Sequence, residues 1–154
     1  MRTYTACYWS EIGPFEIVGT DKGIMTIRFN TDPLVIDNNL PASMTECLRQ
    51  LEEYFKGRRQ KFDVPLLLEG TDFQKAVWRQ LQKIPFGQTT SYGDVARAID
   101  RPTAYRAVGN ANNKNPVPLI IPCHRVIGSD GKLVGFGGGI WRKQWLLDHE
   151  SSLR

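Results

Sequence analysis

The N-terminal part of the chain alternates short apolar runs with turn-forming residues. β-Branched and aromatic side chains gather at residues 3–9, 15–19 and 24–29, and runs of this kind are typical of strands. A Gly-Pro pair at 13–14 and a polar turn at 21–23 separate the runs. Because short turns join antiparallel strands, we expect a small antiparallel sheet.

A helical pattern follows the predicted sheet. Residues 30–41 are polar and contain two prolines, which indicates a loop. From residue 42 to residue 56 apolar side chains recur at helical spacing, and Gly57 follows as a stop signal. The apolar positions are Met44, Cys47, Leu48, Leu51, Tyr54 and Phe55. We predict one helix here, and we place Cys47 and the strand residue Cys7 in the core, because free cysteine packs as a small hydrophobe.

Three further helices are predicted in the second half of the chain. A Thr-x-x-Gln capping box begins a helix that covers residues 71–84. A second helix covers 91–99 with Ser91 as its cap, and a third covers 102–112 with Pro102 at its first position. The second and third helices are joined by a tight turn, which predicts a helix-turn-helix of the kind that binds DNA.

Side-chain size and charge favour the same hypothesis. The third predicted helix carries mostly small side chains, so it can lie close to a DNA groove with Arg106 projecting from it. Residues 71–154 hold 12 basic and 6 acidic side chains, whereas residues 1–70 hold 8 basic and 10 acidic ones. A basic half that contains the helix-turn-helix favours nucleic acid as the partner. The alternative is an ordinary pair of helices with a solvated basic face.

The candidate chemistry lies in residues 115–126, NPVPLIIPCHRV. Their three prolines predict a stiff, extended segment that the apolar residues 119–121 bury. Cys123 follows directly as a positioned nucleophile, His124 is a candidate base, and Glu150 is a candidate to orient the histidine. The alternatives are a structural core cysteine and a histidine without a catalytic role.

Length and composition exclude several classes of protein. The 154 residues, 17.5 kDa, form one ordinary domain or two small ones. No apolar run is long enough to span a bilayer, and we expect no signal peptide, because the N-terminus lacks an apolar segment. The three cysteines show no CxxC spacing, which argues against a disulfide framework and favours a cytoplasmic protein. The two histidines are too few for a His-rich metal site.

These patterns together predict a two-part α/β (α+β) protein. A small N-terminal antiparallel sheet with a helix occupies residues 1–63, and residues 64–71 form a connector. Residues 72–154 form a mainly helical C-terminal domain that contains the helix-turn-helix and the candidate thiol.

Five motifs make the sequence similar to a known family. They are PCHRV at 122–126, NPVP at 115–118, RAVG at 106–109, TSYG at 90–93 and WLLDHE at 145–150. On these motifs the chain resembles the O6-alkylguanine-DNA alkyltransferases, also called methylated-DNA–protein-cysteine methyltransferases. The resemblance is close over the second half of the chain and holds only in outline over the first.

The resemblance implies a role for each residue of the active site. Cys123 looks like the alkyl acceptor, and His124 looks like the base that deprotonates it through a water. Glu150 resembles the carboxylate that orients His124, and Asn115 resembles the side chain that ties the active-site turn. Tyr92 looks like the phenol that faces the flipped base and protonates the leaving guanine.

The resemblance also implies how DNA is held. In this family the helix-turn-helix lies in the minor groove of double-stranded DNA, and Arg106 looks like the finger that fills the place of the flipped base. The other positions implied to contact DNA are Tyr92, Ser91, Ala107, Gly109 and Arg125. The positions implied to line the substrate pocket are Val126, Gly135, Phe136, Gly137 and Gly138. Position 136 is tyrosine in some members, so Phe136 lacks the hydroxyl that those members have in the pocket.

The implied activity is DNA repair by direct reversal. The alkyl group of O6-alkylguanine passes irreversibly to the protein's own cysteine, once per chain, with O4-alkylthymine open as a second substrate. No cofactor is implied, and a monomer supplies every role. The structural zinc of some relatives is not expected, because Cys7 is one matching ligand and no histidine precedes His124. The alternatives are a lesion-binding alkyltransferase-like protein without transfer, a helix-turn-helix regulator and a Cys-His-Glu hydrolase.

Overall fold

The computed structural model describes residues 1–29 and 36–153. The chain forms two compact units, Met1–Glu69 and Gly70–Arg154. The loop predicted over residues 30–41 lies partly outside the described residues, and its described part contains no helix or strand before Ala42.

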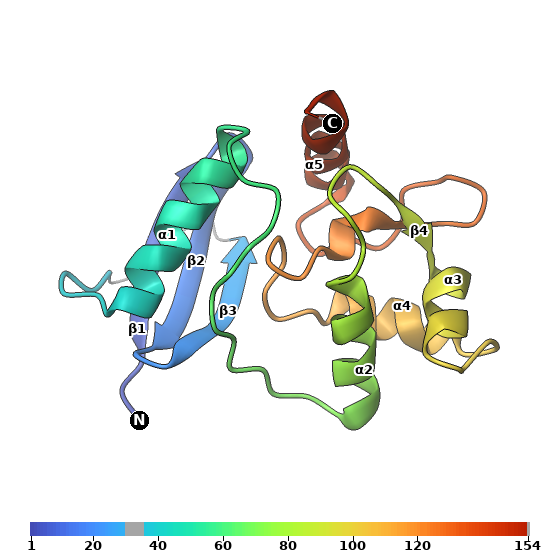
Figure 1. Ribbon diagram of the computed structural model, residues 1–154, viewed down its shortest axis with the longest axis horizontal. Coiled ribbons are helices and arrows are strands. Elements are labelled where there is room, and N and C mark those ends of the chain that lie inside the picture. The colour runs from blue at the N-terminus through green and yellow to red at the C-terminus, as the bar shows by residue number, and fades with distance from the viewer. Residues whose placement is uncertain (30–35, 154) are drawn as a thin grey trace. The chain divides into compact units, whose positions relative to one another are not determined.

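The first unit is a sheet with a helix on one face. Strands β1 (Tyr4–Ser10), β2 (Gly13–Thr20) and β3 (Gly23–Phe29) pair antiparallel in the order β1-β2-β3, as predicted. Helix α1 (Ala42–Phe55) lies across one face of this sheet (Figure 1). Gly57, with a φ of 75°, supplies the left-handed residue that commonly follows a helix end.

The first turn of the sheet differs from the prediction. The chain reverses at Glu11 and Ile12, and the Gly-Pro pair at 13–14 belongs to the start of β2. The Ser10 hydroxyl donates to the carbonyl of Gly13 (2.7 Å) and accepts from the amide of Ile12 (3.1 Å), which closes the turn before the proline. A proline is tolerated at this point because the first residues of a strand can do without a ladder hydrogen bond.

The two cysteines of the first unit have different surroundings. Cys47 is fully buried on α1, as predicted. Cys7 is only half-buried, so its predicted place in the core is wrong. The neighbouring Ala6 is buried, and successive residues of a strand point to opposite faces, so Cys7 lies on the other face of the sheet.

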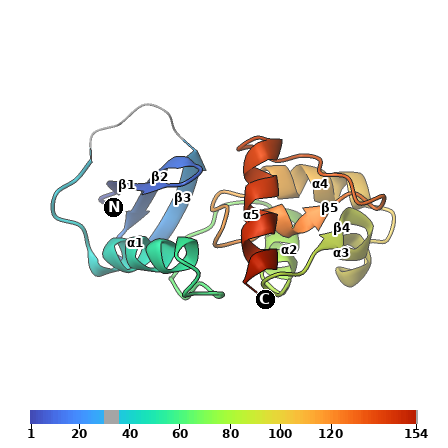
Figure 2. The same ribbon diagram turned by 90° about the horizontal axis from the view of Figure 1, so that it is seen from above.

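The second unit is mainly helical and confirms the mixed α+β class. In chain order it consists of α2 (Asp72–Leu81), β4 (Thr90–Ser91), α3 (Tyr92–Ala98), α4 (Tyr105–Asn113), the 3-10 helix η1 (Cys123–Arg125), β5 (Val126–Ile127) and α5 (Ile140–Ser152). Helix α4 packs against α2 and α3. The Trp78 indole donates to the carbonyl of Ala111 (2.9 Å), which joins α2 to α4. Strands β4 and β5 form a short parallel ladder beside α3 (Figure 2).

The starts of α2 and α3 confirm the predicted caps. The Thr71 hydroxyl accepts from the amide of Gln74 (3.1 Å), and the Gln74 side chain accepts from the amide of Thr71 (3.0 Å). The Ser91 hydroxyl accepts from the amide of Asp94 (3.1 Å). Each cap satisfies amides that the first helical turn leaves without a partner.

Helix α4 begins later than predicted. Pro102 lies in a turn that the amide of Ala104 closes by donating to the carbonyl of Arg101 (2.9 Å), and the helix starts at Tyr105. Asp100, with a φ of 59°, reverses the chain after α3. Helices α3 and α4 are nevertheless the two elements of the predicted helix-turn-helix.

Residues 115–122 form a turn and not the extended segment that their prolines predict. Leu119 has a φ of 79°, and the amide of Ile121 donates to the carbonyl of Val117 (3.0 Å). The Asn115 side chain donates to the carbonyl of Ile121 (2.7 Å) and accepts from the amide of Val117 (3.0 Å). Proline fixes only its own φ, so the residues between two prolines remain able to turn.

Candidate active site

The candidate nucleophile, Cys123, begins η1 directly after this turn. Its amide donates to the carbonyl of Ile121 (2.8 Å), which also accepts from Asn115, so the backbone at the thiol is tied to the turn. The cysteine is buried, with 5% of its surface exposed. Burial raises the pKa of Cys123, while the Asn115 side chain and the positive charge of Lys143 oppose the rise.

The candidate base, His124, is fully buried in the same 3-10 turn. Its Nε2 lies 2.7 Å from a carboxylate oxygen of Glu150 in the last turn of α5. Within the described part of the chain its Nδ1 has no hydrogen-bond partner. A carboxylate at one ring nitrogen fixes the tautomer and leaves the other nitrogen as the proton acceptor. The ring is therefore oriented as a base.

Burial and two nearby positive charges keep the ring neutral. Burial lowers the pKa of His124 from its usual 6.5, although the Glu150 carboxylate acts in the opposite direction. The positive charges of Arg125 and Lys143 add to the lowering. A neutral imidazole can accept a proton, so the chemistry of a general base is available at neutral pH.

Arg125 completes a buried cluster with His124 and Glu150. Its Nε and one terminal nitrogen donate to the two Glu150 oxygens (2.8 and 3.0 Å), and the other terminal nitrogen donates to the carbonyl of Ile84 (2.7 Å). Burial would raise the pKa of Glu150, but hydrogen bonds from His124 and Arg125 outweigh it and hold that pKa well below its usual range. The predicted DNA contact of Arg125 is thereby corrected, because its guanidinium is buried and committed inside the protein.

Tyr92, the first residue of α3, belongs to the same site. Its hydroxyl donates to the carbonyl of Val134 (3.0 Å), in the segment between β5 and α5. Burial raises the pKa of Tyr92, and the charge of Cys123 adds to the rise, so the phenol stays protonated. A Cβ on Gly135 would lie 3.3 Å from this hydroxyl and 2.9 Å from Oδ1 of Asn113. Glycine at 135, with a φ of 61°, therefore leaves space beside the phenol.

The remaining predicted pocket positions follow in the chain. Val126 begins β5 directly after η1. Phe136 is half-buried, Gly138 is buried and Gly137 is exposed. The structure thus brings the middle of the segment 128–139, at Val134 and Gly135, to Tyr92, while the role of these residues in binding a base stays a prediction.

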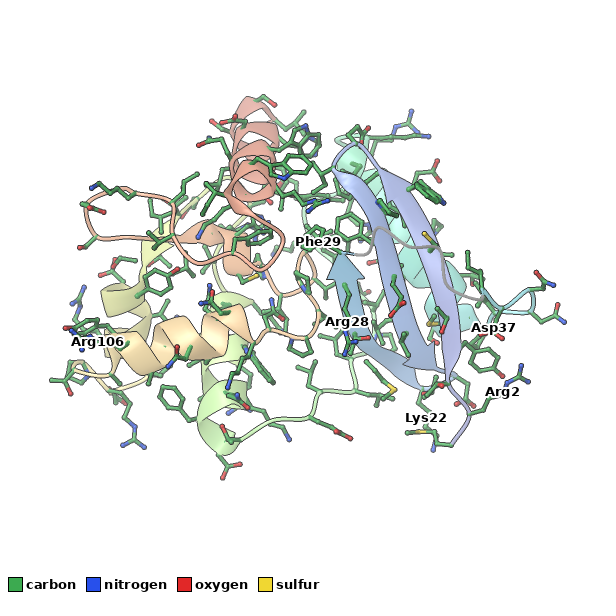
Figure 3. The ribbon with its side chains drawn as sticks, turned by 180° about the vertical axis from the view of Figure 1, so that it is seen from behind. Arg2, Lys22, Arg28, Phe29, Asp37 and Arg106 are labelled. Atoms are coloured by element: carbon green, nitrogen blue, oxygen red, sulfur yellow. The ribbon has the colours of Figure 1, made fainter. Side chains whose placement is uncertain are left out.

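The predicted DNA contacts on α3 and α4 differ in exposure. Arg106 projects outward from the first turn of α4 (Figure 3). Ala107 is exposed and Gly109 is half-exposed, so α4 presents small residues beside the arginine. Ser91 is half-buried, and its hydroxyl is already used as the cap of α3. These contacts with DNA stay predictions.

Sequence reasoning missed one residue of the site, Lys143. It is fully buried, and its ammonium donates to the carbonyls of Val126 (2.6 Å) and Val134 (2.8 Å). A signal exists in the sequence, because Lys143 is spaced three and seven positions before Leu146 and Glu150. All three are buried, and this spacing places them on one face of a helix.

The part of the chain that the structure describes contains no group of three or more His, Cys, Asp or Glu side chains able to hold a metal ion. It also contains no helix long and apolar enough to cross a bilayer.

Comparison with known protein families covers both halves of the chain. Residues 72–152 match the 6-O-methylguanine DNA methyltransferase, DNA binding domain, and residues 3–68 match the 6-O-methylguanine DNA methyltransferase, ribonuclease-like domain. A methylated-DNA–protein-cysteine methyltransferase of Methanosarcina barkeri is 48% identical over 153 residues, covering 94% of this chain and 96% of the relative. That of Mycobacterium bovis is 54% identical over 147 residues, covering 93% and 89%.

Solved structures are similar in fold to this chain over nearly its whole length. The crystal structure of Mycobacterium tuberculosis O6-methylguanine methyltransferase has a TM-score of 0.89 at 42% identity, covering 99% of this chain and 95% of that one. The crystal structure of Mycobacterium tuberculosis OGT in complex with DNA has a TM-score of 0.87 at 44% identity, covering 99% and 94%. These matches, in a chain that buries Cys123 beside His124 and Glu150, show that it belongs to the 6-O-methylguanine DNA methyltransferase family.

Proposed function

We propose that this chain repairs DNA by moving the alkyl group of an O6-alkylguanine in double-stranded DNA onto its own Cys123. The observation that carries the proposal is the buried thiol next to a neutral histidine, His124, whose Nε2 is held by Glu150 at 2.7 Å. The names of the relatives, methylated-DNA–protein-cysteine methyltransferases, support the reaction. The matched DNA-binding domain and the DNA complex of the Mycobacterium tuberculosis protein support DNA as the partner.

The thiol must lose its proton before it can attack. We infer that the proton passes from Cys123 through a water to Nδ1 of His124, the ring nitrogen without a protein partner in the described residues. Glu150 then stabilises the imidazolium that forms. A thiolate is the reactive form of cysteine, and a neighbouring base is the usual way to populate it near neutral pH.

The transfer itself is a displacement at a saturated carbon. The thiolate sulfur of Cys123 forms a bond to the alkyl carbon, and the bond from that carbon to O6 breaks with its electron pair on guanine. Guanine must then gain a proton, and we assign its delivery to Tyr92, whose phenol stays protonated beside the thiol. In the structure this hydroxyl donates to Val134, so it has to exchange that partner for the base.

The alkylated base has to leave the duplex to reach a buried thiol. Extrusion of a base costs a few kcal/mol. We propose that α4 lies in the minor groove and that Arg106, exposed in its first turn, fills the vacated place in the stack. We further propose that Val126 and residues 135–138 receive the base, with the phenyl ring of Phe136 against the alkyl group.

Several properties follow from this chemistry. The product is a thioether, and no group of the site is suited to cleave its carbon–sulfur bond, so each chain acts once. We propose that a monomer carries out the reaction without a cofactor, because the acceptor, the base and Arg106 all come from one chain. A cytoplasmic location suits the three free cysteines. O4-alkylthymine is proposed as a second substrate. The division into an N-terminal domain that ends at residue 63 and a C-terminal domain that begins at residue 72 also stays a proposal.

The test is intact mass after incubation with a duplex that contains O6-methylguanine, followed by peptide mapping. We expect a gain of one CH₂, mapped to Cys123, which never exceeds one equivalent per chain. Cys123→Ala should bind the duplex and gain nothing, whereas the matched control Cys7→Ala should react like the unchanged protein.

The other outcomes separate the alternatives. Lesion binding without a mass change would indicate a protein that recognises damage and does not transfer the group. Transfer that persists in Cys123→Ala would overturn the acceptor assignment. Absence of both transfer and lesion preference would overturn the proposed function and favour a regulator or a hydrolase.

A further inference from the structure

The feature that the transfer chemistry does not use is the buried ammonium of Lys143. The side chain has no exposed surface. Its partners are two neutral carbonyls, at 2.6 and 2.8 Å. None of the ion pairs found among residues 1–29 and 36–153 includes it. Lysine is almost never fully buried unless its charge is paired, so this position needs an explanation.

The two carbonyls belong to different parts of the site. Val126 begins β5, directly after the 3-10 helix that carries Cys123. Val134 lies in the segment 128–139, and its carbonyl also accepts from the hydroxyl of Tyr92 (3.0 Å). The ammonium of Lys143 therefore joins β5, which follows the Cys123 turn, to the segment 128–139. The Tyr92 phenol is linked to both through the carbonyl of Val134. Loss of the two bonds from Lys143 would remove this link between the segment and the strand.

The charge of Lys143 also acts on the reacting groups. It lowers the pKa of Cys123 against the effect of burial, and it lowers the pKa of His124 in the same direction as burial. Burial outweighs the opposing charge of Cys123 and lowers the pKa of Lys143 itself to about 8. The other buried charges nearby, Arg125 and Glu150, already pair with each other.

We propose that Lys143 is a positioning residue that holds the segment 128–139 onto β5 and, in its protonated form, is a counter-charge of the Cys123 thiolate. Its part in alkyl transfer rests on the function proposed above, whereas its effect on the thiol does not. With the lysine charged, the thiolate and the ammonium balance each other inside the site. Attraction between opposite charges is strong in such a poorly solvated place.

The first experiment measures the thiol without DNA. The rate of alkylation of Cys123 by iodoacetamide, located by peptide mapping, is followed against pH. We expect Lys143→Met to move the midpoint up by about one pH unit, which lowers the rate near neutral pH about tenfold. Lys143→Gln keeps a donor without the charge and should shift equally, whereas Lys143→Arg keeps the charge and should stay within about twofold of the parent rate.

The matched control is Lys132→Met, which removes an exposed lysine from the same segment and should leave the midpoint unchanged. Thermal unfolding of each variant shows that it is folded. An unchanged midpoint in folded Lys143→Met and Lys143→Gln would overturn the proposal. A role in packing alone would lower the melting temperature of these variants and leave the midpoint in place.

A reciprocal measurement keeps the proposal testable if the neutral variants do not fold. The pKa of the Lys143 ammonium, followed by nuclear magnetic resonance, should be lower in Cys123→Ser than in the parent protein. Coupling between two sites is the same from either side, so an equal pKa in both proteins would overturn the counter-charge.

Failure of the proposed function is distinguishable from failure of this inference. A lysine-dependent thiol midpoint without transfer from O6-methylguanine would overturn the function alone. Transfer with a lysine-independent midpoint would overturn the counter-charge alone.

Discussion

Three buried side chains of the site, two of them charged, hold one another in a fixed orientation. Glu150 accepts from the guanidinium of Arg125 and lies against the imidazole of His124, and all three are buried. Such clusters often cost as much in lost hydration as they gain in attraction. Their effect here is orientation, because the carboxylate holds one ring nitrogen and leaves the other without a partner among the described residues, as the proposed proton transfer requires.

The neutral buried state of His124 makes stability depend on pH. Its pKa in the folded protein is lowered from 6.5, so the unfolded chain takes up a proton first as the pH falls. The free energy of unfolding should therefore decrease below about pH 6.5, by up to about 1.4 kcal/mol per pH unit. Urea unfolding at about pH 7.5 and about pH 5.5 measures this decrease.

The matched variant is His124→Gln, whose amide can still reach Glu150. It should be less stable than the parent at neutral pH but should lose less stability on acidification. His149 is present in both proteins and cancels in the comparison. Equal losses in the two proteins would show that His124 is not the group responsible.

The residues of the site were predictable to different degrees. Cys123, His124 and Glu150 stand in motifs, and the structure shows the expected contact between His124 and Glu150. Arg125 and Lys143 show the limit of that reasoning, because a charged residue is expected at the surface unless its buried partner is known. The partners of Arg125 lie 41 residues before it and 25 residues after it, which only the folded chain reveals.

At the scale of helices and turns, the sequence predicts some boundaries of the elements that position the site and misses others. Caps at Thr71 and Ser91 were predictable because capping is local. The start of α4 and the turn at 115–122 were not, because proline restricts φ without deciding between a turn, a helix start and an extended strand. In both places hydrogen bonds to nearby carbonyls decide the conformation.

The segment between β5 and α5 offers a prediction at this scale. Gly135→Ala should slow transfer from O6-methylguanine by about ten- to a hundredfold, because its Cβ would lie 2.9 Å from Asn113 and 3.3 Å from the Tyr92 hydroxyl. Single-turnover rates with excess duplex measure the effect.

Gly131→Ala is the matched control for the backbone strain. Gly131 also has a positive φ, 84°, but a Cβ there meets nothing within 4 Å. Both substitutions should cost about 1–2 kcal/mol of stability, and only Gly135→Ala should slow the transfer. Equal rates in the two variants would contradict a role for the space at Gly135.

At the scale of the whole molecule, the two-part architecture was predictable because hydrophobic period and turn residues change along the chain. The exact boundary between the two parts could not be read from the same sequence patterns. Residues 65–67, inside the predicted connector, pair with the edge of β3 through the Ile24 amide to Pro65 (2.9 Å) and the Leu67 amide to Ile24 (2.8 Å). Long-range pairing of this kind leaves little trace in a local pattern.

Charge is divided unequally between the two units, and this division makes a last prediction. The second half of the chain holds 12 basic and 6 acidic residues, and the first half holds 8 and 10. Binding to duplex DNA releases one counterion for roughly each phosphate that a basic residue neutralises, so affinity should fall steeply with salt.

Arg101→Ala, at the exposed turn between α3 and α4, should reduce the slope of log affinity against log salt by about one. Arg58→Ala removes an arginine of the first unit that is also exposed and should leave the slope unchanged. Titrations of both variants at several salt concentrations measure the slopes, and equal changes would mean that net charge, rather than the basic face of the helix-turn-helix, attracts the DNA.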